Sequence, residues 1–236
     1  MPAAAVVDVL EFAGVFVAGL VARIGIFLAM AAVLVVPALV LAGAIRWAGA
    51  RRRRALGLRR VGGLLYRPGV RYAPGHTWLE RRHDRDAVEV GLDDLALRLL
   101  PSVTAVELPR AGTTVARGEP IAHVHGGGRA VAIPAPVPGV VVGVNAAVVR
   151  DPGLVKRDGY GRGWLVALAP AGPAWEDLPS GPDAEAFLQG ESVRLSRFLE
   201  QRLGFAAADG GELVSPAPWL VGEEGWRALV AEFLSR

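Results

Sequence analysis

The residues whose types and spacing could most readily bind a ligand lie together in the middle of the chain. They are His125, Gly126, Gly127, Gly128 and Arg129. Glycines adopt positive φ angles freely and leave their backbone amides bare, so such a turn could hold an anion or a partner's carboxylate, with the arginine beside it. The other interpretation is a loose turn that binds nothing, and we favour it.

The remaining residues do not indicate a metal site or a catalytic site. The chain has no cysteine, which excludes thiolate metal sites and a cysteine nucleophile. His123 and His125 are two positions apart and would share one face of a strand, but a metal site needs a third ligand, and only His76 and His83 remain. No Ser/His/Asp signature, phosphate-binding glycine motif or paired carboxylates occur either. We expect no metal site and a protein that is not an enzyme.

An apolar segment near the N-terminus is long enough to cross a membrane. From Ile24 to Ile45 it runs for 22 residues without a charge. At about 1.5 Å per residue, such a helix spans the roughly 30 Å hydrocarbon core. Asp8 and Glu11 precede it, whereas a signal peptide starts with basic residues and has a shorter apolar core. We expect residues 1–48 to hold a retained transmembrane helix.

Basic residues follow the span directly. Trp47 is placed to anchor the membrane interface. Four arginines come next: Arg51, Arg52, Arg53 and Arg54. Because positive charge stays in the cytoplasm, we expect a single-pass protein of a bacterial-type inner membrane, with its N-terminus outside and its C-terminal part in the cytoplasm. The arginines could also hold anionic lipid head groups. Residues 61–236 carry more acidic than basic side chains, so we expect no nucleic-acid binding.

After a basic juxtamembrane linker at residues 49–69, residues 70–181 alternate short β-rich runs with turns that contain Gly and Pro. The runs lie at 88–91, 103–108, 121–125, 131–133, 140–144 and 164–168. Short strands at such spacing are typical of a sandwich or barrel. A short helix is expected over residues 92–100, capped by Asp93 or Asp94 and stopped by Pro101.

Residues 182–236 read as a helical extension. A first helix is expected from Asp183, its N-cap, to about Leu203, where Gly204 ends it. Residues 205–222 read as a loop, and a last helix is expected over residues 223–235. The apolar side chains of that helix recur at helical spacing: Trp226, Leu229, Val230, Phe233 and Leu234. The helix either packs on the β region or docks to a partner helix.

Four blocks of sequence carry a family resemblance. They occupy residues 72–79, 90–96, 106–112 and 144–165. In this order they resemble conserved blocks of the glycine cleavage system H protein, a lipoyl carrier, and the resemblance extends over residues 71–188. It implies a mainly β fold, a lipoyl-type barrel-sandwich hybrid with small helices. In this chain that fold would follow one transmembrane helix and precede the helical extension. The resemblance also places a lipoyl lysine at the exposed tip of a hairpin.

The lipoyl position is where this sequence departs from the family. When the motifs at 118–119 and 135–136, which flank the hairpin, are aligned with the family, Gly128 falls at the lipoyl lysine without a gap. Glycine has no amine, so no lipoyl amide can form there, and the guanidinium of Arg129 stays protonated. The only lysine in the chain, Lys156, belongs to a different segment. We therefore expect no bound lipoate or other cofactor.

The sequence thus predicts a membrane-anchored H-protein-like module without a lipoyl group, which acts by contact with an unidentified protein partner and with membrane lipid. Two alternatives stay open. One is a lipoyl or aminomethyl carrier of glycine cleavage, or of a related lipoate pathway, that uses another attachment residue or binds free lipoate. The other is a periplasmic adaptor whose barrel packs against transporter partners, which requires the opposite topology.

Overall fold

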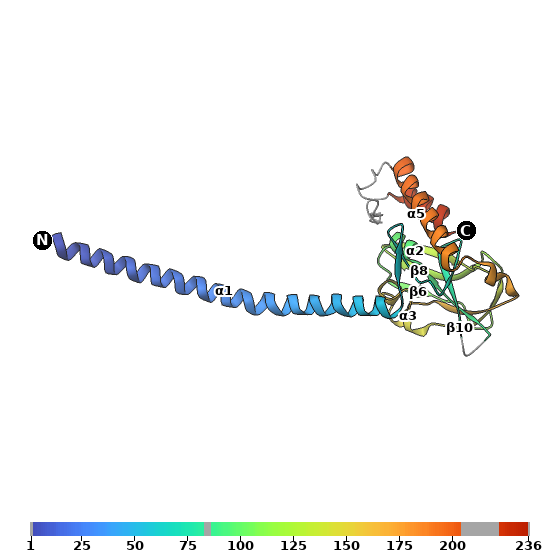
Figure 1. Cartoon of the computed structure of the whole chain (residues 1–236), viewed down its shortest axis with the longest axis horizontal. Helices are drawn as coiled ribbons and strands as arrows, with labels where there is room; N and C mark the ends of the chain where they lie inside the picture. The colour runs from blue at the N-terminus through green and yellow to red at the C-terminus, as the bar shows by residue number, and fades with distance from the viewer. Residues whose placement is uncertain (1, 83–85, 204–221, 236) are drawn as a thin grey trace. The chain divides into compact units, whose positions relative to one another are not determined.

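The chain divides into two compact units, Met1–Ala55 and Leu56–Arg236. The computed structural model describes residues 2–82, 86–203 and 222–235. The first unit is one continuous helix, α1 (Pro2–Ala55), with Pro37 inside it (Figure 1). Its segment Ala22–Arg52 contains an 18-residue stretch with a mean hydropathy of 2.8 and is long and apolar enough to cross a membrane. The expected helix of membrane-spanning length is therefore present.

Helix α1 has no polar face. Its apolar residues are spread around all sides, and large side chains such as Phe27, Leu34 and Leu41 are exposed. A helix that is apolar all round is stable only when protein or lipid surrounds it. The helix also runs further than expected, because the first residues of the basic stretch 49–69 still belong to it.

The second unit consists mostly of antiparallel β-sheet, as expected. A small hairpin joins β1 (Arg59–Val61) and β2 (Leu64–Tyr66) within the basic stretch. The largest sheet has the order β3 (Arg71–Ala73), β4 (Thr77–Arg81), β5 (Val88–Leu92), β11 (Val166–Pro170), β10 (Gly139–Val144) and β7 (Thr114–Val115). A third sheet has the order β6 (Ala105–Glu107), β8 (Pro120–Gly126) and β9 (Arg129–Pro134). Closure of these sheets into a barrel-sandwich hybrid stays a prediction.

The core of this unit forms around an aromatic cluster. Trp78 is fully buried, stacks on Tyr160 at 6.1 Å, and donates its Nε1–H to the carbonyl of Gly159 at 3.1 Å. The neighbouring strand approaches so closely that a Cβ on Gly91 would lie 2.5 Å from the Trp78 ring. Two of the sequence blocks that carry the resemblance, residues 72–79 and 90–96, thus supply the Trp78 ring and the side-chain-free position that accommodates it.

Short helices connect the strands. They are α2 (Asp94–Leu99), α3 (Ala146–Arg150), α4 (Leu154–Arg157) and the 3-10 turn η1 (Pro173–Asp177). As expected, Asp93 caps α2 by accepting from the Ala96 amide at 3.0 Å. Asn145 caps α3 in the same way, through the amide of Ala147. Helices α3 and α4 were not among the expected elements.

The C-terminal region contains both expected helices. The first is α5 (Gly181–Leu203), which begins two residues before Asp183. Asp183 therefore lies in the first turn and is not the N-cap residue, which corrects that expectation. The second is α6 (Glu223–Leu229), which continues as a π-helical turn, η2 (Val230–Leu234). The predicted end at Gly204 and the predicted loop up to residue 221 lie outside the described residues.

Candidate functional site

Strands β8 and β9 form a tight hairpin whose turn is made of glycine. Gly126 pairs with Arg129, which leaves Gly127 and Gly128 as a two-residue loop. Their φ angles are +58° and +74°. Positive φ at both central residues is typical of a type I′ turn, whose twist matches that of paired strands. The three glycines thus form a defined turn at the end of a regular hairpin.

The surroundings of the three glycines differ sharply. A Cβ on Gly126 would lie 1.9 Å from the carbonyl oxygen of Ser102, so only glycine fits there. A Cβ on Gly127 would lie 3.2 Å from Pro101. A Cβ on Gly128 would have nothing within 4 Å. Gly128 is therefore the position of this turn from which a side chain would project into open space.

The two histidines of β8 are not brought together with other ligands. His123 is exposed, while His125 is half-buried with its Nε2 3.2 Å from Glu107 Oε1, in a geometry that is not a hydrogen bond. Within residues 2–82, 86–203 and 222–235, no three histidine or carboxylate side chains gather as a metal would require. His83 lies outside these ranges.

Arg129, next to the turn, contacts the C-terminal helix of its own chain. Its guanidinium lies over the ring of Trp226, 4.8 Å from the centroid, and its Nε is 3.6 Å from Glu223 Oε2. A hollow of about 400 Å³ beside this contact is lined by residues 128–130 and by residues of α6 and η2. The arginine beside the glycines is thus occupied by a cation–π contact and an ion pair.

Lys156 lies on α4 and has a structural partner. Its Nζ donates to the carbonyl of Leu100 at 2.7 Å and approaches that of Pro101 at 3.4 Å. Burial lowers the pKa of this amine. Leu100 is the C-cap of α2, so the lysine satisfies a carbonyl at the end of that helix. The only amine-bearing side chain of the sequence is therefore not in the turn between β8 and β9.

The residues expected at the membrane interface all belong to α1. Trp47 is exposed, and the guanidinium of Arg51 lies over its ring at 5.4 Å. Arg52 and Arg54 are exposed as well, and Arg53 lies in the same turn of the helix. These side chains form one basic end of the apolar helix.

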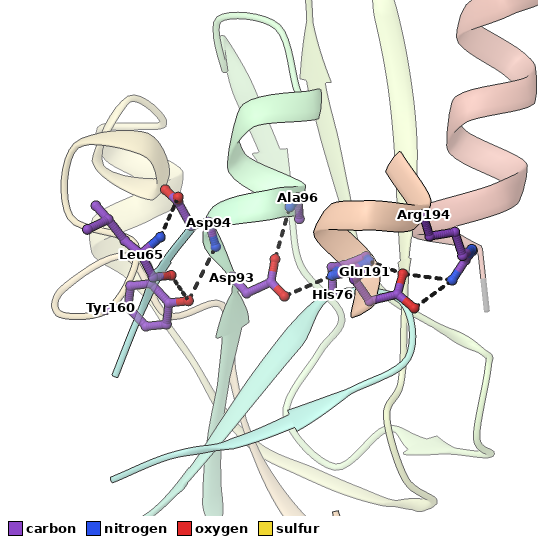
Figure 2. A network of polar contacts seen from close by, with 8 residues as sticks. All are labelled: Leu65, His76, Asp93, Asp94, Ala96, Tyr160, Glu191 and Arg194. Atoms are coloured by element: carbon purple, nitrogen blue, oxygen red, sulfur yellow. Dashed lines mark hydrogen bonds and ion pairs between the residues drawn. The ribbon is translucent and has the colours of Figure 1, made fainter. Parts of the chain in front are cut away.

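A second polar site lies inside the fold and centres on His76 (Figure 2). This side chain is 2% exposed, and its backbone has a φ of +59°, the only positive value at a non-glycine position among the described residues. Its Nδ1 is 2.9 Å from Asp93 Oδ2, and its Nε2 is 3.3 Å from Glu191 Oε2. The ring thus lies between two carboxylates, one at the start of α2 and one on α5.

The two carboxylates decide the charge of this histidine. Burial by itself would lower the pKa of His76, but Asp93 and Glu191 outweigh that effect and raise the pKa to about 9. Conversely, burial would raise the pKa of Glu191, whereas His76 and Arg194 hold that pKa below its usual range. At neutral pH, His76 is therefore a buried cation that donates from both ring nitrogens.

The ion pairs continue to the C-terminal residues. Arg194 binds both oxygens of Glu191 at 2.7 Å and also lies 3.0 Å from Glu232 Oε1. Its guanidinium lies over the ring of Phe233 at 4.5 Å. One chain of contacts thus joins the N-cap of α2, His76, α5 and η2. No local sequence pattern around His76 indicates these partners.

Residues 70–191 match the family model described as "Glycine cleavage H-protein". The chain belongs to this family. The H protein of Legionella pneumophila (strain Corby) is 43% identical over 98 residues, which are 42% of this chain and 77% of that protein. An H protein of Thermus thermophilus is 42% identical over 102 residues, which are 43% of this chain and 78% of that protein.

A solved structure gives a similar extent of likeness. The glycine cleavage system H protein of Mycobacterium marinum is 29% identical, with a TM-score of 0.44, and the match covers 52% of this chain and 98% of that one. The H-protein match includes the β8–β9 hairpin, His76 and the first part of α5. Helix α1 and the segment formed by α6 and η2 lie outside it.

Proposed function

We propose that this chain is a membrane-anchored H-protein-like module that carries no covalent lipoyl group. It acts without catalysis, by contact with a protein partner. The observation that carries the proposal is the turn between β8 and β9. Gly128, the position at which the family resemblance places the lipoyl lysine, has a φ of +74° and free space around it, but it has no side-chain amine.

The residues near this turn do not fit a lipoyl group. Attachment needs a primary amine that projects from a rigid turn into solvent. Arg129 offers a guanidinium, which stays protonated and which Trp226 and Glu223 contact. Lys156 lies on α4, and its amine donates to the carbonyl of Leu100. Neither side chain replaces the missing lysine at the turn.

Helix α1 is the feature that supports a membrane anchor. Its segment Ala22–Arg52 is long and apolar enough to span a membrane, and its last turns carry Trp47 and the four arginines at 51–54. The charge asymmetry favours a cytoplasmic C-terminal part and an inner-membrane location, with anionic lipid head groups near the arginines. A soluble carrier of small groups would need no such helix, so the anchor supports a role at the membrane surface.

An acceptor assay tests the missing attachment site. The purified full chain and its Gly128→Lys variant are incubated with a lipoate ligase, ATP and lipoate, and each product is weighed by mass spectrometry. We expect no lipoyl increment on the wild-type chain and one increment on the variant, because the turn has room for a side chain at 128. A lipoyl increment on the wild-type chain would overturn the proposal.

A further inference from the structure

The segment formed by residues 223–234, α6 together with η2, covers a face of the H-protein-like domain. Its apolar side chains at helical spacing are buried: Trp226, Leu229, Phe233 and Leu234. The segment lies outside the matched region, while much of the face that it covers, from Arg129 on β9 to His76, lies inside it. A segment outside the matched region thus covers a face that lies largely within it.

One end of the segment binds beside the glycine turn. Trp226 packs under the guanidinium of Arg129, and Glu223 supplies a carboxylate to the same arginine. The hollow of about 400 Å³ between residues 128–130 and the segment adjoins this contact. The end near the turn is thus held by one aromatic anchor and a partly exposed ion pair.

The other end packs against aromatic and charged side chains. Phe233 is fully buried, with its ring 6.2 Å from that of His76 and 5.6 Å from that of Phe198, which it meets edge-on. Arg194 lies over Phe233 and pairs with Glu232. Two aromatic side chains seven positions apart therefore hold the two ends of the segment on the covered face, and each has a carboxylate of the segment near it.

We propose that this face is a helix-docking groove, which residues 223–234 occupy in cis and which can exchange that segment for a helix of a partner protein. The partner helix has the same chemistry: it is amphipathic, with two aromatic residues seven positions apart and an acidic residue three positions before the first. This inference rests on the proposed function as an interaction module and names the surface that such a module uses.

Because the segment is part of the same chain, it sets a lower limit on the affinity that a partner helix needs in order to displace it. Residues 204–221 connect α5 covalently to the segment, so the segment competes with a free helix intramolecularly, at a higher effective concentration than a free helix has in dilute solution. A free helix of equal intrinsic affinity would not displace it at micromolar concentration. A partner must bind more tightly or be concentrated near this chain, as a protein of the same membrane would be.

A binding experiment with the segment itself as the probe tests the groove. A fluorescent peptide of residues 222–236 is titrated into the full chain in detergent, and binding is followed by anisotropy. We expect no binding to the wild-type chain below about 100 μM, because the groove is occupied. The Trp226→Ala/Phe233→Ala double variant should bind the peptide at least tenfold more tightly, since its own segment has lost both anchors. The Glu224→Ala variant, which changes an exposed side chain of α6, should behave like the wild type.

A second form of the chain keeps every groove residue native, in case the double variant does not fold. A protease site inserted among residues 204–221 allows the segment to be cut from an intact, folded chain. After cleavage, the labelled peptide should exchange with the native segment, while a peptide with Phe233→Ala should not. Failure of the labelled peptide to bind both the folded double variant and the cleaved chain would overturn the proposal. Because this readout does not involve lipoate, it is independent of the acceptor assay.

Discussion

The carboxylate of Glu191 lies 3.3 Å from Nε2 of His76 and thereby ties helix α5 to the turn between β3 and β4. The opposite ring nitrogen of His76 is held by Asp93. A buried cation between two carboxylates is costly to leave half-paired, because the remaining charge loses its compensation in a medium of low dielectric. This contact therefore links α5 to the β region through one buried ion pair.

Replacing Glu191 by Gln should destabilise the second unit by about 1–3 kcal/mol, because it removes one charged partner of a buried histidine. The replacement should also lower the pKa of His76. Urea unfolding and an NMR titration of the ring measure the two effects. Glu176→Gln is the matched control, because Glu176 pairs with Arg81 at the surface. This variant should lower the free energy of unfolding by less than about 0.5 kcal/mol. Equal effects of the two variants would contradict the role given to Glu191.

The stability of this unit should fall as the pH rises above neutrality. The folded pKa of His76 is about 9, above the unfolded value of 6.5, so the folded state binds the proton more tightly. The stabilisation that the protonated ring gives to the folded state is fully present below pH 6.5. It is lost as the pH rises to about 9, at up to about 1.4 kcal/mol per pH unit. His76→Asn, which tolerates the positive φ, should abolish the slope. A wild-type stability that stays flat from pH 6.5 to 9 would show that the ring is neutral.

Parts of this site could be predicted from the sequence, and parts could not. The capping role of Asp93 follows from its place before a short helix, and the hairpin follows from two β-rich runs around a glycine turn. The partners of His76 lie at positions 93 and 191, and Glu232 joins the network through Arg194. No local pattern links residues so far apart, because their proximity depends on how α5 and η2 dock. The helices α3 and α4 were missed because each is only one turn long.

Replacing different glycines of the turn by alanine should cause very different losses of stability. Gly126→Ala places a Cβ 1.9 Å from the Ser102 carbonyl, so the backbone must move, and we expect a loss of stability of about 3 kcal/mol or more. Gly128→Ala meets no atom within 4 Å and should cost only the strain of its positive φ, about 1–2 kcal/mol. Thermal unfolding of the two variants provides the comparison. If Gly128→Ala were the more damaging, the turn would not be as open as described.

Lys156→Met should cost about 1 kcal/mol of stability, because the carbonyl of Leu100 loses a charged hydrogen-bond donor at the end of α2. The variant keeps the length of the side chain and its packing. Denaturant unfolding measures the loss. Lys156→Arg should recover most of it, and an unchanged stability in the Met variant would mean that the amine is free for other chemistry.

The orientation of the chain can be tested in cells. With four arginines after the apolar segment, a reporter fused after residue 236 should be active only if it works in the cytoplasm. Replacing Arg51, Arg52, Arg53 and Arg54 by Gln should weaken that preference, because the charge asymmetry across the span disappears. Activity of a periplasm-specific reporter at the same position would instead support the adaptor alternative.

The central claim is that this member of the H-protein family carries no lipoyl group, and the intact mass of the native protein tests it most directly. The chain is purified from membranes of the cells that produce it naturally, grown with lipoate, and weighed without digestion. The mass should equal that of the polypeptide, with no lipoyl increment on any residue, because Gly128 offers no amine at the turn. A mass higher by one lipoyl group, on Lys156 or at any other position, would contradict the account.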